Sequence, residues 1–142
     1  MILPDVNTLV YAHREEAAEH VAFRDWLQDT VNGDQPFGIS DIVLSGFIRV
    51  VTHPKVFSKP SSITEALQFA GQLLTQPGCV LVRPGAAHWG IFTRLCQDYG
   101  ARGNLVPDAF LAALAIESGC EWITTDRDFA RFEGLRWRHP LR

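Results

Sequence analysis

The chain has no excess of positive charge. Its 142 residues carry 13 lysines and arginines against 16 aspartates and glutamates, which gives a formal net charge of −3. Proteins that hold nucleic acid over a broad surface are usually basic, so a polyanion would have to be held locally or through cations. The length suits one domain, residues 1–142, with a core of its own, and is too short for two.

Cysteines are few, and long apolar runs are absent. The three cysteines, Cys79, Cys96 and Cys120, form no CxxC pair and lie among apolar residues, so buried, reduced thiols are expected. The apolar N-terminus lacks the basic segment of a signal peptide and contains Asp5. No apolar run approaches the roughly 18 residues that a membrane helix needs. We therefore expect a cytoplasmic protein that does not contact a membrane.

The motifs of several common enzyme classes are also missing. The chain has no Walker loop, no GxGxxG and no GxSxG, so P-loop hydrolysis, dinucleotide binding and serine hydrolase chemistry have no support. The five histidines lack metal-ligand spacing, and nothing singles out one of them as a general base. The carboxylates remain as the candidates for chemistry.

Short apolar strands alternate with helices along the whole chain. The pattern predicts strands at 1–6, 37–39, 79–82, 121–125 and 135–137, and helices at 7–14, 15–29, 41–52, 62–74, 86–99, 107–118 and 129–132. Such alternation is typical of an α/β fold in which helices cover both faces of a mainly parallel sheet. We expect four or five short strands flanked by about seven helices.

Four polar residues are candidates to cap helices. Ser40 precedes an apolar-periodic segment, and Ser62 opens a capping box with Glu65. Asn7 and Asp128 stand where they could cap the first helix and the last, short one. For these two residues, a capping role and a role in a functional site are both open.

Three carboxylates fall at positions that converge in such a fold. Asp5 ends the first strand, Asp126 follows the strand at 121–125, and Asp108 lies in a helix that begins with Pro107. Ligands of open α/β sheets bind at the carboxyl ends of the strands. An acid within an apolar strand is costly without a partner, and three acids together repel one another unless cations are present. The pattern therefore predicts a site for one or two Mg²⁺ ions, with Mn²⁺ as a substitute.

Three segments of the chain resemble the PIN-domain ribonuclease family. They are MILPDVNTLVYAH at the start, SDIVLSGFIRVVTHPKVF in the middle and NLVPDAFLAALAIESGCEWITTDRDFARF near the end. The resemblance covers nearly the whole chain and is narrower still to the VapC toxins of bacterial toxin–antitoxin pairs, particularly the mycobacterial type. Its specific part is the ordered set Asp5-x-Asn7, Pro107-Asp108-Ala109 and Thr125-Asp126-x-Asp128-Phe129.

The resemblance implies both an activity and partners. Asp5, Asp108 and Asp126 match the family's metal-binding acids, while Asn7 and Asp128 match positions that support them. It implies Mg²⁺-dependent endonuclease cleavage of structured RNA such as transfer or ribosomal RNA. It also implies a homodimer and a small VapB-like antitoxin that blocks the site.

The chain departs from the family pattern at one position in the third helix. The family usually has a glutamate there, and this sequence has Gly46. Asp41 lies five residues earlier, about 140° around a helix, so it does not replace that glutamate directly. Asp128 is a candidate to compensate, and the choice between one and two metal ions stays open.

Two other functions remain open from the sequence. A catalytically weak PIN scaffold that acts by binding RNA or its antitoxin is compatible with Gly46. A metal-dependent phosphatase of small molecules is the other, because Asp5-Val6-Asn7-Thr8 faintly resembles the DxDxT motif of haloacid dehalogenases. Asn7 in place of the second acid counts against it.

Overall fold

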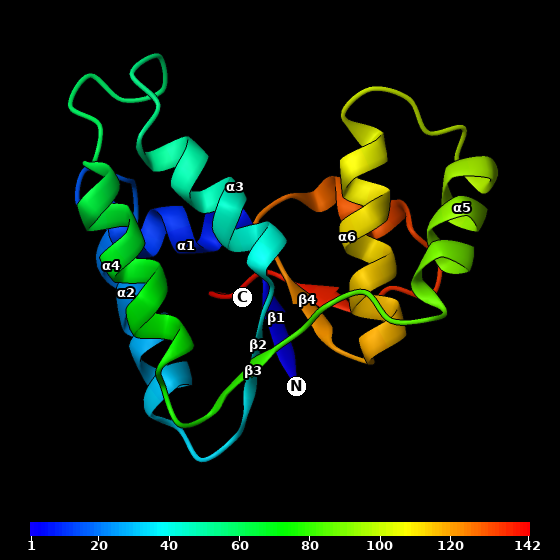
Figure 1. The fold of residues 1–142 in the computed structure, drawn as a ribbon, viewed down its shortest axis with the longest axis horizontal. Helices are drawn as coiled ribbons and strands as arrows, with labels where there is room; N and C mark the ends of the chain where they lie inside the picture. Colours follow the sequence, from blue (N-terminus) through cyan, green and yellow to red (C-terminus); the bar gives the residue numbers. More distant parts are fainter.

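Five short strands form the centre of the molecule (Figure 1). The computed structural model describes residues 1–142 throughout. One sheet holds three strands in the order β1-β4-β5, and a second holds two, and every pairing is parallel. The strands are β1 (Ile2–Pro4), β2 (Phe37–Ile39), β3 (Cys79–Leu81), β4 (Glu121–Ile123) and β5 (Trp137–Arg138). The predicted α/β class with a mainly parallel sheet is confirmed.

The two sheets lie side by side because a glycine lets their backbones approach. A Cβ atom on Gly38 of β2 would come within 3.1 Å of the carbonyl oxygen of Ile2 in β1. A larger residue at that position would push the strands apart. The carboxyl ends of β1 and β4 consequently lie near the segment that follows β2.

Helices pack on both sides of the strands. The helices are α1 (Val6–His13), α2 (His20–Asn32), α3 (Asp41–Val51), α4 (Ile63–Leu74), α5 (His88–Asp98), α6 (Leu105–Ser118) and the 3-10 helix η1 (Arg127–Arg131). Figure 1 shows α1 to α4 grouped on one side and α5 with α6 on the other. No helix is long and apolar enough to cross a membrane.

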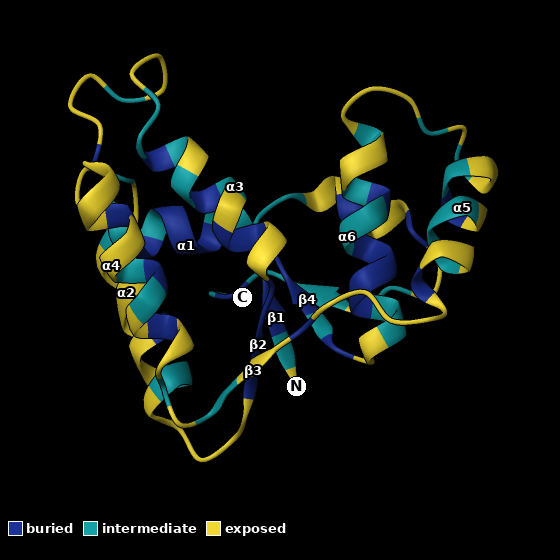
Figure 2. Cartoon of the chain, in the orientation of Figure 1, coloured by how far each residue is buried: buried dark blue, intermediate teal, exposed yellow.

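Buried residues concentrate on β1, β2 and β4 and on the inner faces of the helices, whereas β3 and β5 contain none (Figure 2). Leu3, Trp122 and Phe47 are fully buried and belong to one continuous hydrophobic cluster. Four buried alanines, Ala109, Ala112, Ala113 and Ala115, line α6. Small side chains let a helix pack close to its neighbours, which places the first turn of α6 near the ends of β1 and β4.

The helix caps differ in part from those expected. Ser40 and Ser62 cap α3 and α4 as predicted, and the capping box between Ser62 and Glu65 is complete. The expected caps at Asn7 and Asp128 are wrong. The preceding acids, Asp5 and Asp126, cap α1 and η1 instead, because each carboxylate accepts a hydrogen bond from the backbone just after it.

Most helices also begin at other residues than predicted. The helix predicted at 86–99 begins at His88, and the last, short one predicted at 129–132 begins at Arg127. The segment expected as a helix at 15–29 becomes helical only at His20, because residues 14–19 form a tight turn that ends in Glu19 with a φ of 58°. The helix expected from Pro107 begins at Leu105. Pro107 is tolerated in its first turn because backbone N–H groups there have no partner within the helix.

Candidate active site

A cavity of about 500 Å³ opens at the carboxyl ends of β1 and β4. We call it the acidic cavity, because Asp5, Asp108 and Asp126 all line it. The remaining lining comes from α1, α3, α6, η1 and the loop that joins α3 to α4. Acids that are 121 positions apart in the sequence thus contribute to one hollow.

Asp5 is the most buried of the three acids and is held on both oxygens. Its side chain is only 6% exposed. Oδ1 accepts a hydrogen bond from the backbone N–H of Val6 at 2.7 Å, and Oδ2 accepts one from the Thr124 hydroxyl at 2.7 Å. These contacts fix the orientation of a carboxylate that could not be buried without them.

Burial raises the pKa of Asp5 to about 6. The hydrogen bonds from Thr124 and Val6 oppose this shift, while the charges of Asp108 and Asp126 add to it. A bound cation would reverse the effect, because it favours the ionised carboxylate. The metal-free cavity therefore holds a carboxyl group that is ready to ionise when positive charge arrives.

Thr124 and Asn7 connect Asp5 to the strand that leads into Asp126. The Thr124 hydroxyl donates to Asp5 and accepts the backbone N–H of Asp126 at 3.0 Å. Asn7 donates to Asp5 Oδ2 at 3.4 Å, and its Oδ1 accepts the backbone N–H of Thr125 at 3.4 Å. Sequence reasoning missed Thr124. The available signal was a hydroxyl directly after an apolar strand. In the fold this hydroxyl lies beside Asp5, because the strands that precede the two residues pair with each other.

Asp108 enters the cavity from the first turn of α6 and is half-buried. Burial raises its pKa, and the negative charge of Asp126 raises it further, whereas Arg131 lowers it. The two acids therefore interact through their charges although they come from different elements. Like charges held near each other favour the binding of a cation between them.

Asp126 lines the cavity, but Asp128 does not. Asp126 Oδ1 accepts the backbone N–H of Asp128 at 2.9 Å, so η1 fixes the orientation of this carboxylate. The Asp128 side chain is 72% exposed, and its Oδ1 lies 3.9 Å from Arg131. Asp128 thus acts on the cavity through its backbone and its charge.

The donor set suits a hard divalent cation, but the acids do not form a compact ligand cluster. No group of three or more His, Cys, Asp or Glu side chains is arranged so that it could hold a metal ion directly. Carboxylate oxygens are nevertheless the ligands that Mg²⁺ and Mn²⁺ prefer, and Mg²⁺ usually keeps several waters. An ion held partly through water fits three acids that line one cavity, where burial and neighbouring negative charge raise the pKa of Asp5 and of Asp108.

The wall opposite the acids carries Gly46, Arg49 and Phe57. A Cβ atom on Gly46 would lie 2.9 Å from Cγ2 of Val6, so a glutamate fits there only if Val6 moves. Arg49 is exposed and pairs with no carboxylate. This wall therefore carries an unpaired positive charge, on Arg49, close to Gly46, the position at which the family usually has a glutamate.

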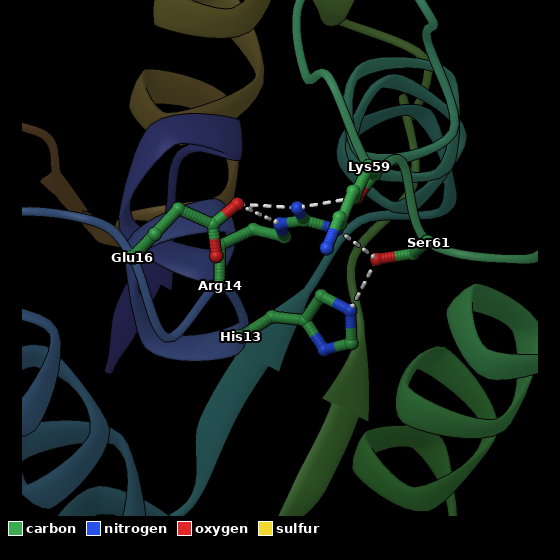
Figure 3. A network of polar contacts seen from close by, with 5 residues as sticks. All are labelled: His13, Arg14, Glu16, Lys59 and Ser61. Carbon is green, nitrogen blue, oxygen red and sulfur yellow. Dashed lines mark hydrogen bonds and ion pairs between the residues drawn. The ribbon is translucent and has the colours of Figure 1, made fainter.

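Phe57 is kept in this wall by a network around Arg14 (Figure 3). The Arg14 guanidinium lies 4.2 Å from the centroid of the Phe57 ring and donates to the Ser61 hydroxyl at 2.9 Å and the Lys59 carbonyl at 2.7 Å. Glu16 pairs with Arg14 from the other side. The end of α1 thereby holds the loop between α3 and α4, and with it one wall of the cavity.

Comparison with known proteins shows which family has this arrangement. The model of the PIN domain matches residues 2–135. The chain belongs to the PIN-domain family, within its VapC branch. A VapC ribonuclease of Mycobacterium bovis, Mb2897, is 49% identical over 99% of this chain and 96% of its own length. Ribonuclease VapC25 of Mycobacterium tuberculosis is 36% identical over 99% of each chain.

Solved structures share this PIN fold. VapBC2 of Rickettsia felis, determined bound to a DNA fragment from its promoter, superposes with a TM-score of 0.69 at 20% identity and covers 98% of each chain. VapC20 of Mycobacterium tuberculosis, described as a toxin that cleaves the sarcin-ricin loop, has a TM-score of 0.64 at 17% identity. It covers 96% of this chain and 99% of that one. At such low identity the likeness extends to the fold alone.

Proposed function

We propose that this PIN domain is a metal-dependent endoribonuclease toxin that hydrolyses phosphodiester bonds in structured cellular RNA, transfer or ribosomal RNA. The observation that carries the proposal is the acidic cavity itself, where Asp5, Asp108 and Asp126 line one hollow at the carboxyl ends of the strands. The relatives named as ribonucleases, which match almost the whole chain, support the reaction class.

The polar residues of the cavity have proposed parts in the reaction. Asp5, Asp108 and Asp126 would hold Mg²⁺, or Mn²⁺ in its place, which would supply Lewis-acid polarisation of a phosphoryl oxygen and lower the pKa of an attacking water. Thr124 and Asn7 keep the Asp5 carboxylate oriented, as their hydrogen bonds indicate.

The reaction needs no nucleophile from the protein. The residues that line the cavity include no serine, cysteine, lysine or histidine. Arg49 is placed to neutralise the charge of the phosphate backbone. Asp128 supports Asp126 from outside the cavity, through the hydrogen bond from its backbone N–H.

Gly46 favours one firmly held ion. With no fourth acid on α3, a second ion would depend on the RNA phosphate for part of its coordination. The same departure favours the second candidate function, a catalytically weak scaffold that acts by binding RNA or an antitoxin. The two differ in whether activity requires the three acids.

The proposal includes partners of the toxin. Structural neighbours of this chain were solved as VapBC complexes, which supports a VapB-like antitoxin as inhibitor. We further propose a homodimer that acts in the cytoplasm. Co-expression with any small open reading frame found beside its gene, followed by size-exclusion chromatography with light scattering, tests both associations.

Cleavage of RNA by the purified protein tests the activity. The chain is expected to cut RNA in Mg²⁺ or Mn²⁺ and to stop when EDTA is added, and the 5′ ends of the products identify the site. The variant Asp126→Asn should be inactive, while Asp25→Asn on the exposed face of α2 serves as a matched control. Cleavage that persists in EDTA would contradict the proposal. Growth arrest by the Asp126→Asn variant would favour the scaffold, and hydrolysis of small phosphoesters without RNA cleavage would favour a phosphatase.

A further inference from the structure

A second hollow lies against the acidic cavity and is lined by none of the three acids. It has a volume of about 410 Å³ and shares Val10, Tyr11 and Phe57 with the acidic cavity, so the two lie on either side of one wall. We call it the side pocket. Its lining also includes Glu19, Phe23, Thr125 and His139.

The side pocket presents aromatic rings. Tyr11 and Phe23 meet edge to face with their ring centroids 5.1 Å apart, and the His139 ring lies 6.0 Å from Phe23. Phe57 adds a fourth ring, held by Arg14 on the wall shared with the acidic cavity. Phe23 is only 2% exposed and backs the rings of Tyr11 and His139, so the half-buried rings that face the pocket are those of Tyr11, Phe57 and His139. Flat faces of this kind are the surfaces on which unpaired bases stack in RNA recognition.

Glu19, the N-cap residue of α2, brings an exposed carboxylate to the rim. Its side chain makes no capping hydrogen bond and no ion pair, and its charge acts on His139, where it opposes the lowering of the pKa of that ring. Glu16, the other acid of the pocket, is already bound by Arg14. Glu19 is also the only non-glycine residue with a positive φ, 58°. A side chain kept in that disfavoured backbone region commonly marks a functional position.

The chemistry of the pocket identifies its ligand. A free carboxylate repels phosphate, so the RNA backbone would not enter the side pocket, whereas the adjoining acidic cavity is suited to phosphate through a cation. A carboxylate accepts hydrogen bonds from base amino groups, and guanine offers N1–H and the 2-amino group side by side to its two oxygens. The ligand must therefore be flat, rich in donors and attached to a phosphate one short step away.

We infer that the side pocket binds a guanine base that flanks the scissile phosphate, with Glu19 accepting hydrogen bonds from its amino edge and the aromatic rings stacking on its face. This inference deepens the proposed function and rests on it. Glu19 is then a residue that determines sequence specificity, and it takes no part in bond cleavage.

Short single-stranded RNAs that carry either guanosine or inosine near the cut site test the inference. Inosine lacks only the 2-amino group. The wild-type protein is expected to cleave the guanosine form about tenfold faster at one position beside the cut, the scale of one bidentate contact to a base. Glu19→Gln should abolish this difference, because cleavage of the guanosine form slows more than cleavage of the inosine form. Glu15→Gln, on the same turn but outside the side pocket, should keep it.

Binding of the same RNAs separates this inference from the proposed function. Fluorescence anisotropy in Ca²⁺ is expected to show tighter binding of the guanosine form by the wild type and equal binding of both forms by Glu19→Gln. If no RNA is cleaved but this preference in binding is found, the proposed function fails and the base pocket stands. Equal treatment of the two RNAs by the wild type, or an unchanged preference in Glu19→Gln, overturns the inference. The inference is also overturned if Glu19→Gln weakens only the binding of an antitoxin, because the side pocket would then bind a protein.

Discussion

The two walls of the acidic cavity are built in different ways. The acidic wall carries Asp5, Asp108 and Asp126. Hydrogen bonds from nearby backbone N–H groups orient the carboxylates of Asp5 and Asp126, and the Thr124 hydroxyl also donates to Asp5. The opposite wall carries Arg49 and Phe57. There the loop is held by Arg14, which is 47 positions away from Ser61 in the sequence.

The two walls therefore differ in their roles, because the acidic wall carries the reacting groups and the opposite wall affects how the substrate binds. The acidic wall buries carboxylates and places them beside like charges, and both effects raise the pKa of Asp5 and of Asp108 and make the metal-free fold less stable. The opposite wall buries no carboxylate, but its position depends on the Arg14 guanidinium and the groups that contact it. Changes in the acidic wall should therefore remove the reaction, whereas changes in the opposite wall should alter substrate binding and rate more mildly.

The largest expected effect comes from Asp5→Asn. We expect a loss of cleavage rate of about a thousandfold, equivalent to about 4 kcal/mol of transition-state stabilisation by a correctly held metal ion. Asp128→Asn removes a carboxylate that lies outside the cavity, and it should cost only about tenfold, as outer residues of metal sites do. Initial rates on one RNA measure both. Equal losses in the two variants would contradict the distinction between lining and supporting acids.

An intermediate effect is expected from Arg14→Ala, which frees the opposite wall. The change removes the contacts to Phe57, Ser61 and Lys59 together. We expect the catalytic efficiency to fall about tenfold, mainly through a higher KM, because the loop no longer has one position. Arg24→Ala, in an exposed pair on α2, is the matched control. A fall as large as that of Asp5→Asn would show that the loop takes part in the chemistry.

A smaller effect concerns the stability of the metal-free acidic wall. Asp5 has a folded pKa of about 6 against an ordinary value of 3.8, so the folded state holds its proton more tightly than the unfolded state. Stability is then greatest at low pH and is lost as the pH rises through 6. Between about pH 5 and pH 7.5 this group should lower the free energy of unfolding by about 1 kcal/mol.

Urea denaturation in EDTA measures this change. The Asp5→Asn variant should lose less stability over the same interval, because Asn does not titrate there. Mg²⁺ added at the higher pH should restore stability to the wild type, since an ion that binds only the folded state stabilises it. A wild type whose stability rises with pH at the same rate as that of the variant would contradict the raised pKa.

The smallest effect is expected at Gly46, where the opposite wall lacks an acid. Val6→Ala makes room beside this position, because Val6 Cγ2 is the atom that a Cβ would meet. In that background, Gly46→Glu should lower the Mg²⁺ concentration needed for half-maximal activity by about threefold, because an added carboxylate strengthens cation binding. The Val6→Ala variant alone is the control. No change in the Mg²⁺ requirement would show that the missing glutamate is not replaced at this place.

Local sequence signals predicted the elements well and their ends less well. The strand at 37–39, the capping box at Ser62 and the end of α6 at Gly119, with a φ of 72°, are as expected. The caps at Asn7 and Asp128 are wrong, because in each case the acid two residues earlier ends an extended segment and captures the first free N–H groups. Which of two neighbouring polar residues caps a helix depends on where the preceding strand stops pairing, and sheet formation decides that.

The sequence by itself determined the fold class and the set of acids. Short apolar runs and period-3.6 patterns indicate which segments form strands and helices, and an acid in an apolar strand is costly unless it has a partner. Tertiary structure alone decided which side chains surround the acids. Thr124 meets Asp5 across 119 positions of sequence, and Arg14 reaches the loop at Ser61, because parallel strands and packed helices bring distant segments together. Contacts of this kind leave no periodic trace in the chain, since they depend on the packing of whole elements.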